Sequence, residues 1–155
     1  MAEEQRASQS GSQGESLAEQ IGLTDQEYAA MGKIGAIYYQ QGELEKARTI
    51  FEGLVELNPQ SAAAHAALGA VYTRAGEDDL ALFHLDRAIE LDPQMIAPYV
   101  NRAEVRIKLG QAEAAVADIE RAVELDPEER DAAANRARAM AVAIAEAVRA
   151  AQGKR

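Results

Sequence analysis

The sequence has 155 residues, of which 48% are apolar and only 5% aromatic, with no tryptophan and no cysteine. That length suffices for one folded domain, and small aliphatic side chains suit a core of packed helices better than a sheet, which favours β-branched and aromatic residues. The 16 basic and 26 acidic residues leave a formal charge of −10, which repels phosphate backbones and anionic lipids, so we expect neither nucleic acid nor membrane as a partner.

Other absences bear on the compartment. Without cysteine the chain has no disulfides, no thiolate catalysis and no Cys-based zinc site. No apolar run approaches the roughly 20 residues that cross a bilayer. The start, MAEEQRASQSGSQGES, has neither the basic nor the apolar region of a signal peptide. We therefore expect a soluble cytoplasmic protein.

Residues 1–16 are mostly Ser, Gln, Gly and Glu with almost nothing to bury, and we expect a disordered N-terminal tail there. Order is expected over 17–152. Ser16 with Glu19, and Thr24 with Glu27, have the Ser/Thr-x-x-Glu spacing in which a side chain and a backbone N–H cap each other at a helix start. The two starts predict a short helix followed by a longer one.

An internal repeat dominates the rest of the chain. ELNP, ELDP and ELDP end at Pro59, Pro93 and Pro127, each 34 residues after the last. In the same register lie two further sets, Gly42, Gly76 and Gly110, then Ala47, Ala81 and Ala115. Because glycine ends a helix and proline cannot continue one, each period predicts a helix–turn–helix unit.

The residues around these markers resemble the tetratricopeptide repeat (TPR). That family carries a large residue at position four, Leu-Gly at seven and eight, Tyr at eleven, a small residue at twenty, an aromatic or aliphatic residue at twenty-four, Ala at twenty-seven and Pro at thirty-two. The second unit shows the pattern with His65, Leu68, Gly69, Tyr72, Ala81, Leu85, Ala88 and Pro93. The resemblance implies an all-α fold with repeats 28–61, 62–95 and 96–129 stacked in a right-handed superhelix.

Two regions extend or depart from the pattern. In the third unit Arg102 and Arg106 fall where apolar residues are usual, and we expect their stems to lie along apolar surface with the charged heads in water. After Pro127 the Ala-rich sequence predicts a capping helix over about 128–152. Met140, Ile144 and Val148 recur at four-residue spacing, so one face of that helix is expected to cover the open end of the stack.

Signals for catalysis, cofactors or metals are weak. The sequence has no nucleophile beside a base, no Gly-x-x-x-x-Gly-Lys and no His-x-x-x-His pair, so we expect no enzyme, no catalytic residue and no cofactor. Gly32–Gly35, GKIG, falls inside a predicted helix rather than in a phosphate-binding loop. His65 and His84 are interpreted as packed or surface residues, and Glu77–Asp79 as a solvated helix start rather than a calcium loop, so no metal site is expected.

In stacked repeats the first helix of each unit forms the concave inner wall. The corresponding positions predict a peptide-binding groove, small and apolar at its centre and polar toward one edge, made by Gly32, Lys33, Ala36, Tyr39, Gln40, Ala63, Ala66, Ala67, Ala70, Arg74, Ala97, Asn101, Glu104 and Lys108. TPR co-chaperones that grip the acidic C-terminus of a heat-shock protein use Lys, Asn and Arg at five such positions. The matching residues here are Gly32, Ala36, Ala67, Ala97 and Asn101, so no carboxylate clamp is expected.

Three functions remain open on the sequence. The first is a non-catalytic module or scaffold whose groove takes an extended or helical segment of a partner protein. The whole layout, with tail, leading helix, three repeats and closing helix, is also similar to the class II chaperones of type III secretion, which hold segments of translocator proteins. The third is a structural protein that self-assembles through its ends. We expect a monomer or a weak homodimer.

Overall fold

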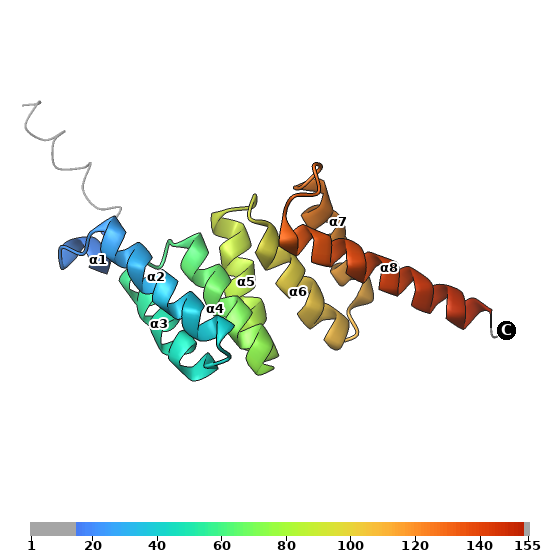
Figure 1. Ribbon diagram of the computed structural model, residues 1–155, viewed down its shortest axis with the longest axis horizontal. Helices are drawn as coiled ribbons and strands as arrows, with labels where there is room; N and C mark the ends of the chain where they lie inside the picture. The colour runs from blue at the N-terminus through green and yellow to red at the C-terminus, as the bar shows by residue number, and fades with distance from the viewer. Residues whose placement is uncertain (1–14, 154–155) are drawn as a thin grey trace, which may run out of the picture.

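The computed structural model describes residues 15–153, and all regular structure in that range is helical (Figure 1). The elements are α1 (Leu17–Gln20), α2 (Asp25–Gln40), α3 (Leu44–Leu57), α4 (Ala62–Ala75), α5 (Asp78–Leu91), α6 (Ile96–Lys108), α7 (Ala112–Glu124) and α8 (Ala132–Gln152). They form an elongated stack, with α1 at one end and the C-terminal part of α8 running out at the other (Figure 1). The predicted all-α fold is confirmed. Most of the predicted tail, residues 1–14, lies outside the described residues.

Side-chain caps fix the first two helix starts as predicted. At α1, Ser16 Oγ accepts from the Glu19 N–H at 3.3 Å, while the Glu19 carboxylate accepts from the Ser16 N–H at 2.8 Å. Thr24 and Glu27 make the same reciprocal pair at α2, at 3.2 and 2.9 Å. Each cap satisfies backbone donors that have no partner within the helix.

Glycines turn the chain between the two helices of each unit. Gly42, Gly76 and Gly110 have φ of +79°, +78° and +74°, the left-handed region that other residues enter only with strain. The resulting pairs are α2–α3, α4–α5 and α6–α7, and each pair packs against the next. The helix–turn–helix units predicted from the 34-residue period are therefore confirmed.

The core holds its smallest residues where paired helices cross. Ala47, Ala81 and Ala115, equivalent in the three units, are 0% exposed. A Cβ added at Gly69 of α4 would lie 2.7 Å from Leu85 Cγ of α5, closer than carbon atoms can pack. The close approach of α4 and α5 therefore depends on the missing side chain at this position.

Replacing Gly69 by alanine tests this contact. We expect Gly69→Ala to lower the free energy of unfolding by about 1–3 kcal/mol, because overpacking Leu85 outweighs the gain in helix propensity. Gly53→Ala is the matched control, since a Cβ at Gly53 of α3 meets nothing within 4 Å. The control should raise stability by about 0.5–1 kcal/mol. Urea unfolding followed by circular dichroism measures both, and an unchanged or more stable Gly69→Ala variant would contradict the contact.

The charged heads of Arg102 and Arg106 are not in water, so that prediction was wrong. Arg102 donates from Nε and Nη2 to the two carboxylate oxygens of Asp118 at 3.0 and 2.6 Å, and from Nη1 to Asp86 at 2.6 Å. Arg106 Nη1 reaches Asp118 at 2.7 Å. Asp118, on α7, is only 3% exposed, and a carboxylate buried to that degree needs paired cations. The two arginines supply them, which explains polar residues at positions that are usually apolar.

The stability of the protein should therefore depend far more on Asp118 than on Asp86, the other carboxylate of the cluster. We expect Asp118→Asn to lower the free energy of unfolding by about 3–5 kcal/mol, because it leaves the half-buried Arg106 without a carboxylate and Arg102 with Asp86 alone. Asp86→Asn, whose side chain is 50% exposed, should cost less than about 1 kcal/mol. Thermal unfolding of the two variants checks this, and equal losses would show that the cluster does not depend on Asp118.

The capping helix differs in detail from its prediction. It begins at Ala132, capped by Asp131, and not near residue 128, because the Asp126 carboxylate holds a turn by accepting from the N–H groups of Arg130 and Asp131. Met140 and Ile144 pack against the core of the third unit. Val148 is 50% exposed, so its predicted place on the covering face was wrong. The last turns of α8 extend past the stack (Figure 1).

The opposite end of the stack is open. On α2, Ile34 and Ile37 are 48% and 51% exposed, whereas their equivalents on α4, Leu68 and Val71, are both 1% exposed under α3. The difference arises because no helix of the described residues precedes α2 in the way that α3 precedes α4. None of the helices in 15–153 combines the length and apolar content needed to span a membrane.

Candidate functional site

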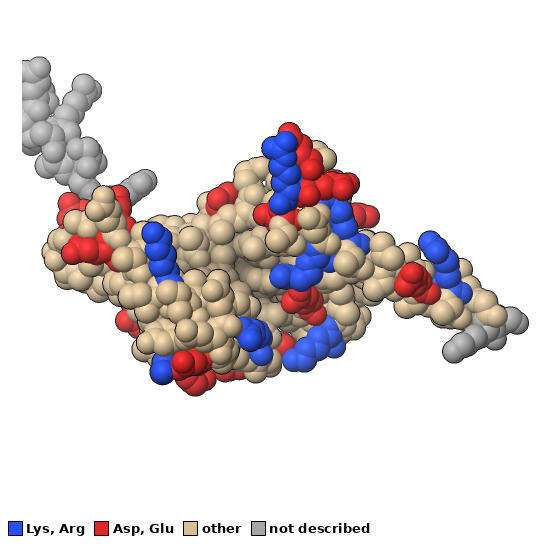
Figure 2. All heavy atoms as spheres, in the orientation of Figure 1, with Lys and Arg blue, Asp and Glu red and all other residues tan. Residues whose placement is uncertain are grey.

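The first helices of the units, α2, α4 and α6, follow one another along one side of the stack, with α3, α5 and α7 behind them (Figure 1). The middle of the face shown in Figure 2 is largely uncharged. Lys, Arg, Asp and Glu gather instead near the turn between α7 and α8 and along the edges (Figure 2). This distribution leaves a largely uncharged surface in the middle of that face.

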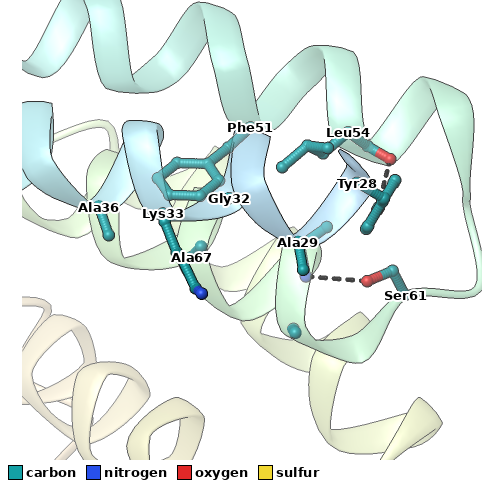
Figure 3. A pocket seen from close by; sticks show the side chains of 11 residues that line it. Tyr28, Ala29, Gly32, Lys33, Ala36, Phe51, Leu54, Ser61 and Ala67 are labelled. Carbon is teal, nitrogen blue, oxygen red and sulfur yellow. Dashed lines mark hydrogen bonds between the residues drawn. The ribbon is translucent and has the colours of Figure 1, made fainter. Parts of the chain in front are cut away.

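Two neighbouring hollows lie on this surface. The first compartment has a volume of about 420 Å³ and is lined by Tyr28, Ala29, Gly32, Lys33, Ala36, Phe51, Leu54, Ser61, Ala63, Ala64 and Ala67 (Figure 3). The second compartment, about 240 Å³, is lined by Ala36, Tyr39, Phe51, Ala66, Ala67, Ala70, Ala97 and Asn101. Ala36, Phe51 and Ala67 line both, so the two compartments are neighbours. We refer to them together as the groove.

The floor of the groove comes from the second helix of the first unit. Phe51 and Leu54 of α3 reach the groove between α2 and α4, where Gly32 and Ala36 carry too little side chain to cover them (Figure 3). Phe51 remains only 5% exposed, so one aromatic face supports both the core and the groove. The sequence did not indicate either residue as part of the groove. The signal that could have found them is the glycine and alanine opposite them.

The N-terminal mouth of the groove is held by two hydrogen bonds. Tyr28 Oη donates to the Leu54 carbonyl at 2.8 Å, which ties α2 to the end of α3. Ser61 Oγ accepts from the Ala64 N–H at 3.2 Å and thereby caps α4 (Figure 3). The sequence did not indicate Tyr28 or Ser61 as groove residues, because neither lies on the inner positions of a first helix.

Ten of the fourteen residues predicted for the groove line it. They are Gly32, Lys33, Ala36, Tyr39, Ala63, Ala66, Ala67, Ala70, Ala97 and Asn101. The other four, Gln40, Arg74, Glu104 and Lys108, lie outside the two compartments. Five polar residues of the predicted groove were expected to be available to pair with polar groups of a partner: Lys33, Gln40, Arg74, Asn101 and Lys108.

Three of those polar residues are already engaged within the chain. The Arg74 guanidinium donates to the Tyr39 carbonyl at 2.5 Å and lies 4.9 Å from the centre of its ring. Lys108 pairs with Asp78 at 2.8 Å. Asn101 accepts from Arg136 at 2.7 Å. Lys33 makes no ion pair with any residue of 15–153, and it lies at the edge of the first compartment (Figure 3).

The histidines are packed rather than arranged as metal ligands. His65 is 5% exposed, which confirms its interpretation as a core residue. Its Nδ1 lies 3.0 Å from Nδ1 of His84, a contact that the sequence did not indicate. Nowhere in residues 15–153 do three His, Cys, Asp or Glu side chains gather as metal ligands would. Glu77 and Asp78 of the acidic turn instead approach Arg48 and Lys108.

Two models of known families match the sequence. One, described as a tetratricopeptide repeat, matches residues 68–141, and the other, described as a TPR repeat, matches residues 35–76. Together they run from 35 to 141, which includes nearly all of the paired helices described above. The chain is a tetratricopeptide repeat protein. No curated protein matches its sequence.

Solved structures similar to this TPR protein include several from type III secretion. The Yersinia enterocolitica translocator chaperone SycD has a TM-score of 0.76 at 21% identity, covering 84% of this chain and 98% of that one. A T3SS complex from Aeromonas hydrophila has a TM-score of 0.75 at 25% identity, covering 83% and 87%. PcrH, in complex with the chaperone binding region of PopD, has a TM-score of 0.72 at 26% identity, covering 81% and 96%. The predicted resemblance to that class of chaperone is therefore confirmed.

A substitution at Gly32 should change the stability of this TPR protein and its binding of a partner in opposite directions. A Cβ at Gly32 would meet only Leu54 Cδ1, at an ordinary 3.8 Å, so alanine is accommodated. We expect Gly32→Ala to raise the free energy of unfolding by about 0.5–1 kcal/mol, because glycine is a poor helix former. The same methyl group narrows the first compartment and should weaken partner binding. Chemical denaturation and a binding titration check the two effects, and a loss of stability would contradict the geometry.

Proposed function

We propose that this TPR protein is a non-catalytic interaction module that binds an extended or helical segment of a partner protein in the groove. The observation that carries the proposal is the groove itself, two neighbouring and mostly apolar compartments that share Phe51 as their floor. Its volume and lining suit side chains rather than a large cofactor. The glycine and alanines on its walls allow the backbone of a partner to approach closely.

The chemistry of the groove indicates what the segment must contain. Burying apolar surface contributes about 25 cal/mol per Å², so aliphatic or aromatic side chains of the partner would supply most of the affinity. With Arg74, Asn101 and Lys108 engaged in the chain, Lys33 is the cation best placed for an acidic group of the partner. The clamp positions Gly32, Ala36, Ala67, Ala97 and Asn101 carry no charge, which argues against a ligand held by its terminal carboxylate.

A more specific candidate is a cytoplasmic class II chaperone for translocator proteins of type III secretion. It is favoured by the similarity to PcrH, solved with the chaperone binding regions of PopB and of PopD at 26% identity in each case. In this candidate the partner is a segment of a translocator. Genes for secretion components beside the gene of this protein would support it, and a neighbourhood without them would argue for a general scaffold.

Charge placed in the groove tests the proposed function. We expect Ala67→Glu, and Ala70→Glu in the same wall, to weaken binding of a co-purified native partner at least about tenfold, which corresponds to about 1.4 kcal/mol. The reason is that a carboxylate would have to be desolvated against Phe51. Ala117→Glu is the matched control, because Ala117 is exposed on α7 and lines neither compartment. Isothermal titration of the three variants gives the measurement.

Two outcomes would overturn the groove as the binding site. One is unchanged affinity in both groove variants, and the other is an equal loss in Ala117→Glu. Light scattering across a concentration series addresses self-assembly separately. A strict monomer rules out the self-assembling structural protein, whereas growth with concentration would favour it over the interaction module.

A further inference from the structure

His65 and His84 form a hydrogen-bonded pair between α4 and α5. His65 Nε2 lies 3.0 Å from the carbonyl oxygen of Pro59, which can only accept, so this nitrogen carries a proton. In neutral His65 the other nitrogen, Nδ1, is then an acceptor, and His84 Nδ1 must donate to it across 3.0 Å. The bond therefore assigns one tautomer to each ring.

This arrangement tolerates one added proton but not two. A first proton can bind Nε2 of His84 and leave the bond intact. A proton on Nδ1 of His65 would set two N–H groups against each other across 3.0 Å, so the bond would break. Loss of the bond and full protonation of the pair are therefore the same event.

The surroundings keep the pair neutral at ordinary pH. Burial lowers the pKa of His65 from its usual 6.5, and the charge of Arg87 on α5 adds to that effect against the Pro59 carbonyl. Burial and the neighbouring His65 also lower the pKa of His84, against the charge of Glu52 on α3. Tyr72 of α4 lies against the His84 ring and donates to Glu52, which Arg48 also approaches. Burial and Glu52 raise the pKa of Tyr72 to about 12, so that phenol does not titrate here.

The third unit makes the equivalent bond without a titrating group. Tyr99 stands 34 residues after His65, and its hydroxyl donates at 3.2 Å to the carbonyl of Pro93, which stands 34 residues after Pro59. Both bonds hold the start of a first helix to the loop that precedes it. Only the second unit uses an imidazole for this purpose among the three units, since Met31 occupies the position in the first.

The bond of the second unit lies directly behind the groove. Pro59 belongs to the loop between α3 and α4, and Ser61, Ala63, Ala64 and Ala67 on either side of His65 line the first compartment. We propose that the His65–His84 pair is an acid-sensitive latch, which holds the start of α4 against α5 at neutral pH and releases it when the pair takes up two protons. Release of a bound segment at acid pH would follow, and that consequence rests on the proposed function.

The direction of the pH dependence follows from the lowered pKa values. In the unfolded or opened chain the two imidazoles have the ordinary pKa of about 6.5, whereas the pKa values of the latched pair are lower. The opened chain therefore binds protons more readily, so the latch is strongest above pH 6.5 and weakens as the pH falls below it. Because the opened chain can bind two protons more than the latched pair, the opened population should rise by up to about 100-fold per pH unit below pH 6.5, as long as the latched pair stays unprotonated. Above pH 5 most carboxylates, with ordinary pKa values near 4, stay ionised and do not obscure the effect.

A single cysteine in the groove can report the latch, because the natural sequence has none. Ala67→Cys carrying a solvent-sensitive fluorophore reports the first compartment, and Ala117→Cys on α7 is the control position. Between pH 7.5 and 5.0 we expect the emission at position 67 to shift toward that of solvent and the emission at position 117 to stay constant. Adding His65→Tyr, which copies the Tyr99 arrangement, should abolish the shift at position 67.

Nitrogen NMR of the imidazoles in the full chain gives a second readout, independent of any variant. The latch predicts that His65 Nδ1 and His84 Nε2 both titrate below 6.5. Should His65→Tyr fail to fold, His84→Ile, the residue of the first unit at this position, removes the same conflict of N–H groups. An emission shift that persists in either folded variant, no shift in the natural sequence, or a His65 pKa of 6.5 or above would each overturn the latch.

These results are separable from a failure of the proposed function. The fluorophore and NMR measurements involve no partner, whereas the groove variants of the proposed function are measured at pH 7.5, where the latch is closed. If Ala67→Glu leaves the affinity for the partner unchanged while the emission at position 67 still shifts at acid pH, the groove is rejected as the binding site and the latch is retained. If Ala67→Glu weakens partner binding and the emission at position 67 does not shift, only the latch is rejected.

Discussion

The contact that the rest of this structure depends on is the crossing of paired helices over glycine and alanine. At Gly69 the Leu85 side chain of α5 lies directly against the backbone of α4, and at Ala81 only a methyl group is present, while the large residues Leu68 and Tyr72 belong to the same core cluster. Close-packed interiors respond to a single methyl group, so these positions fix the distance between the helices. Small side chains on the inner positions of α2 and α4 likewise let Phe51 line the groove. Core and candidate site are thus two consequences of where small residues stand along the first helices.

Much of the fold was predictable from the sequence because it depends on local signals that repeat. Gly42, Gly76 and Gly110 mark the turns, and the reciprocal caps at Ser16 and Thr24 mark helix starts, whatever the neighbours are. The failures involve contacts between helices far apart in the sequence. Arg102 and Arg106 look like surface residues until Asp118 is placed between them, and Val148 keeps the helical spacing of Met140 and Ile144 but lies beyond the surface that they cover.

The groove shows the same division. Its walls were predictable since they follow fixed positions of each first helix. Its floor was not, because whether Phe51 reaches the groove depends on the size of Gly32 and Ala36 across from it. The roles of the polar residues were the hardest to predict. Arg74 and Lys108 have the charge expected of a partner-binding edge, but Arg74 donates to the Tyr39 carbonyl and Lys108 pairs with Asp78. Charge counted from sequence therefore overstates what the groove presents to a partner.

Ile34 and Ile37 on the open face of α2 bear on how the array could be lengthened. They repeat the aliphatic character that Leu68 and Val71 use to receive α3, yet they stand where the described stack ends. If a further helical unit were joined ahead of Tyr28, its second helix could pack on the exposed side chains of Ile34 and Ile37. At the other end, α8 follows the third unit directly, and an added unit would have to displace Met140 and Ile144 first. Within residues 15–153, the two ends of the stack therefore differ: the first unit ends in exposed aliphatic side chains, and the last unit is covered by α8.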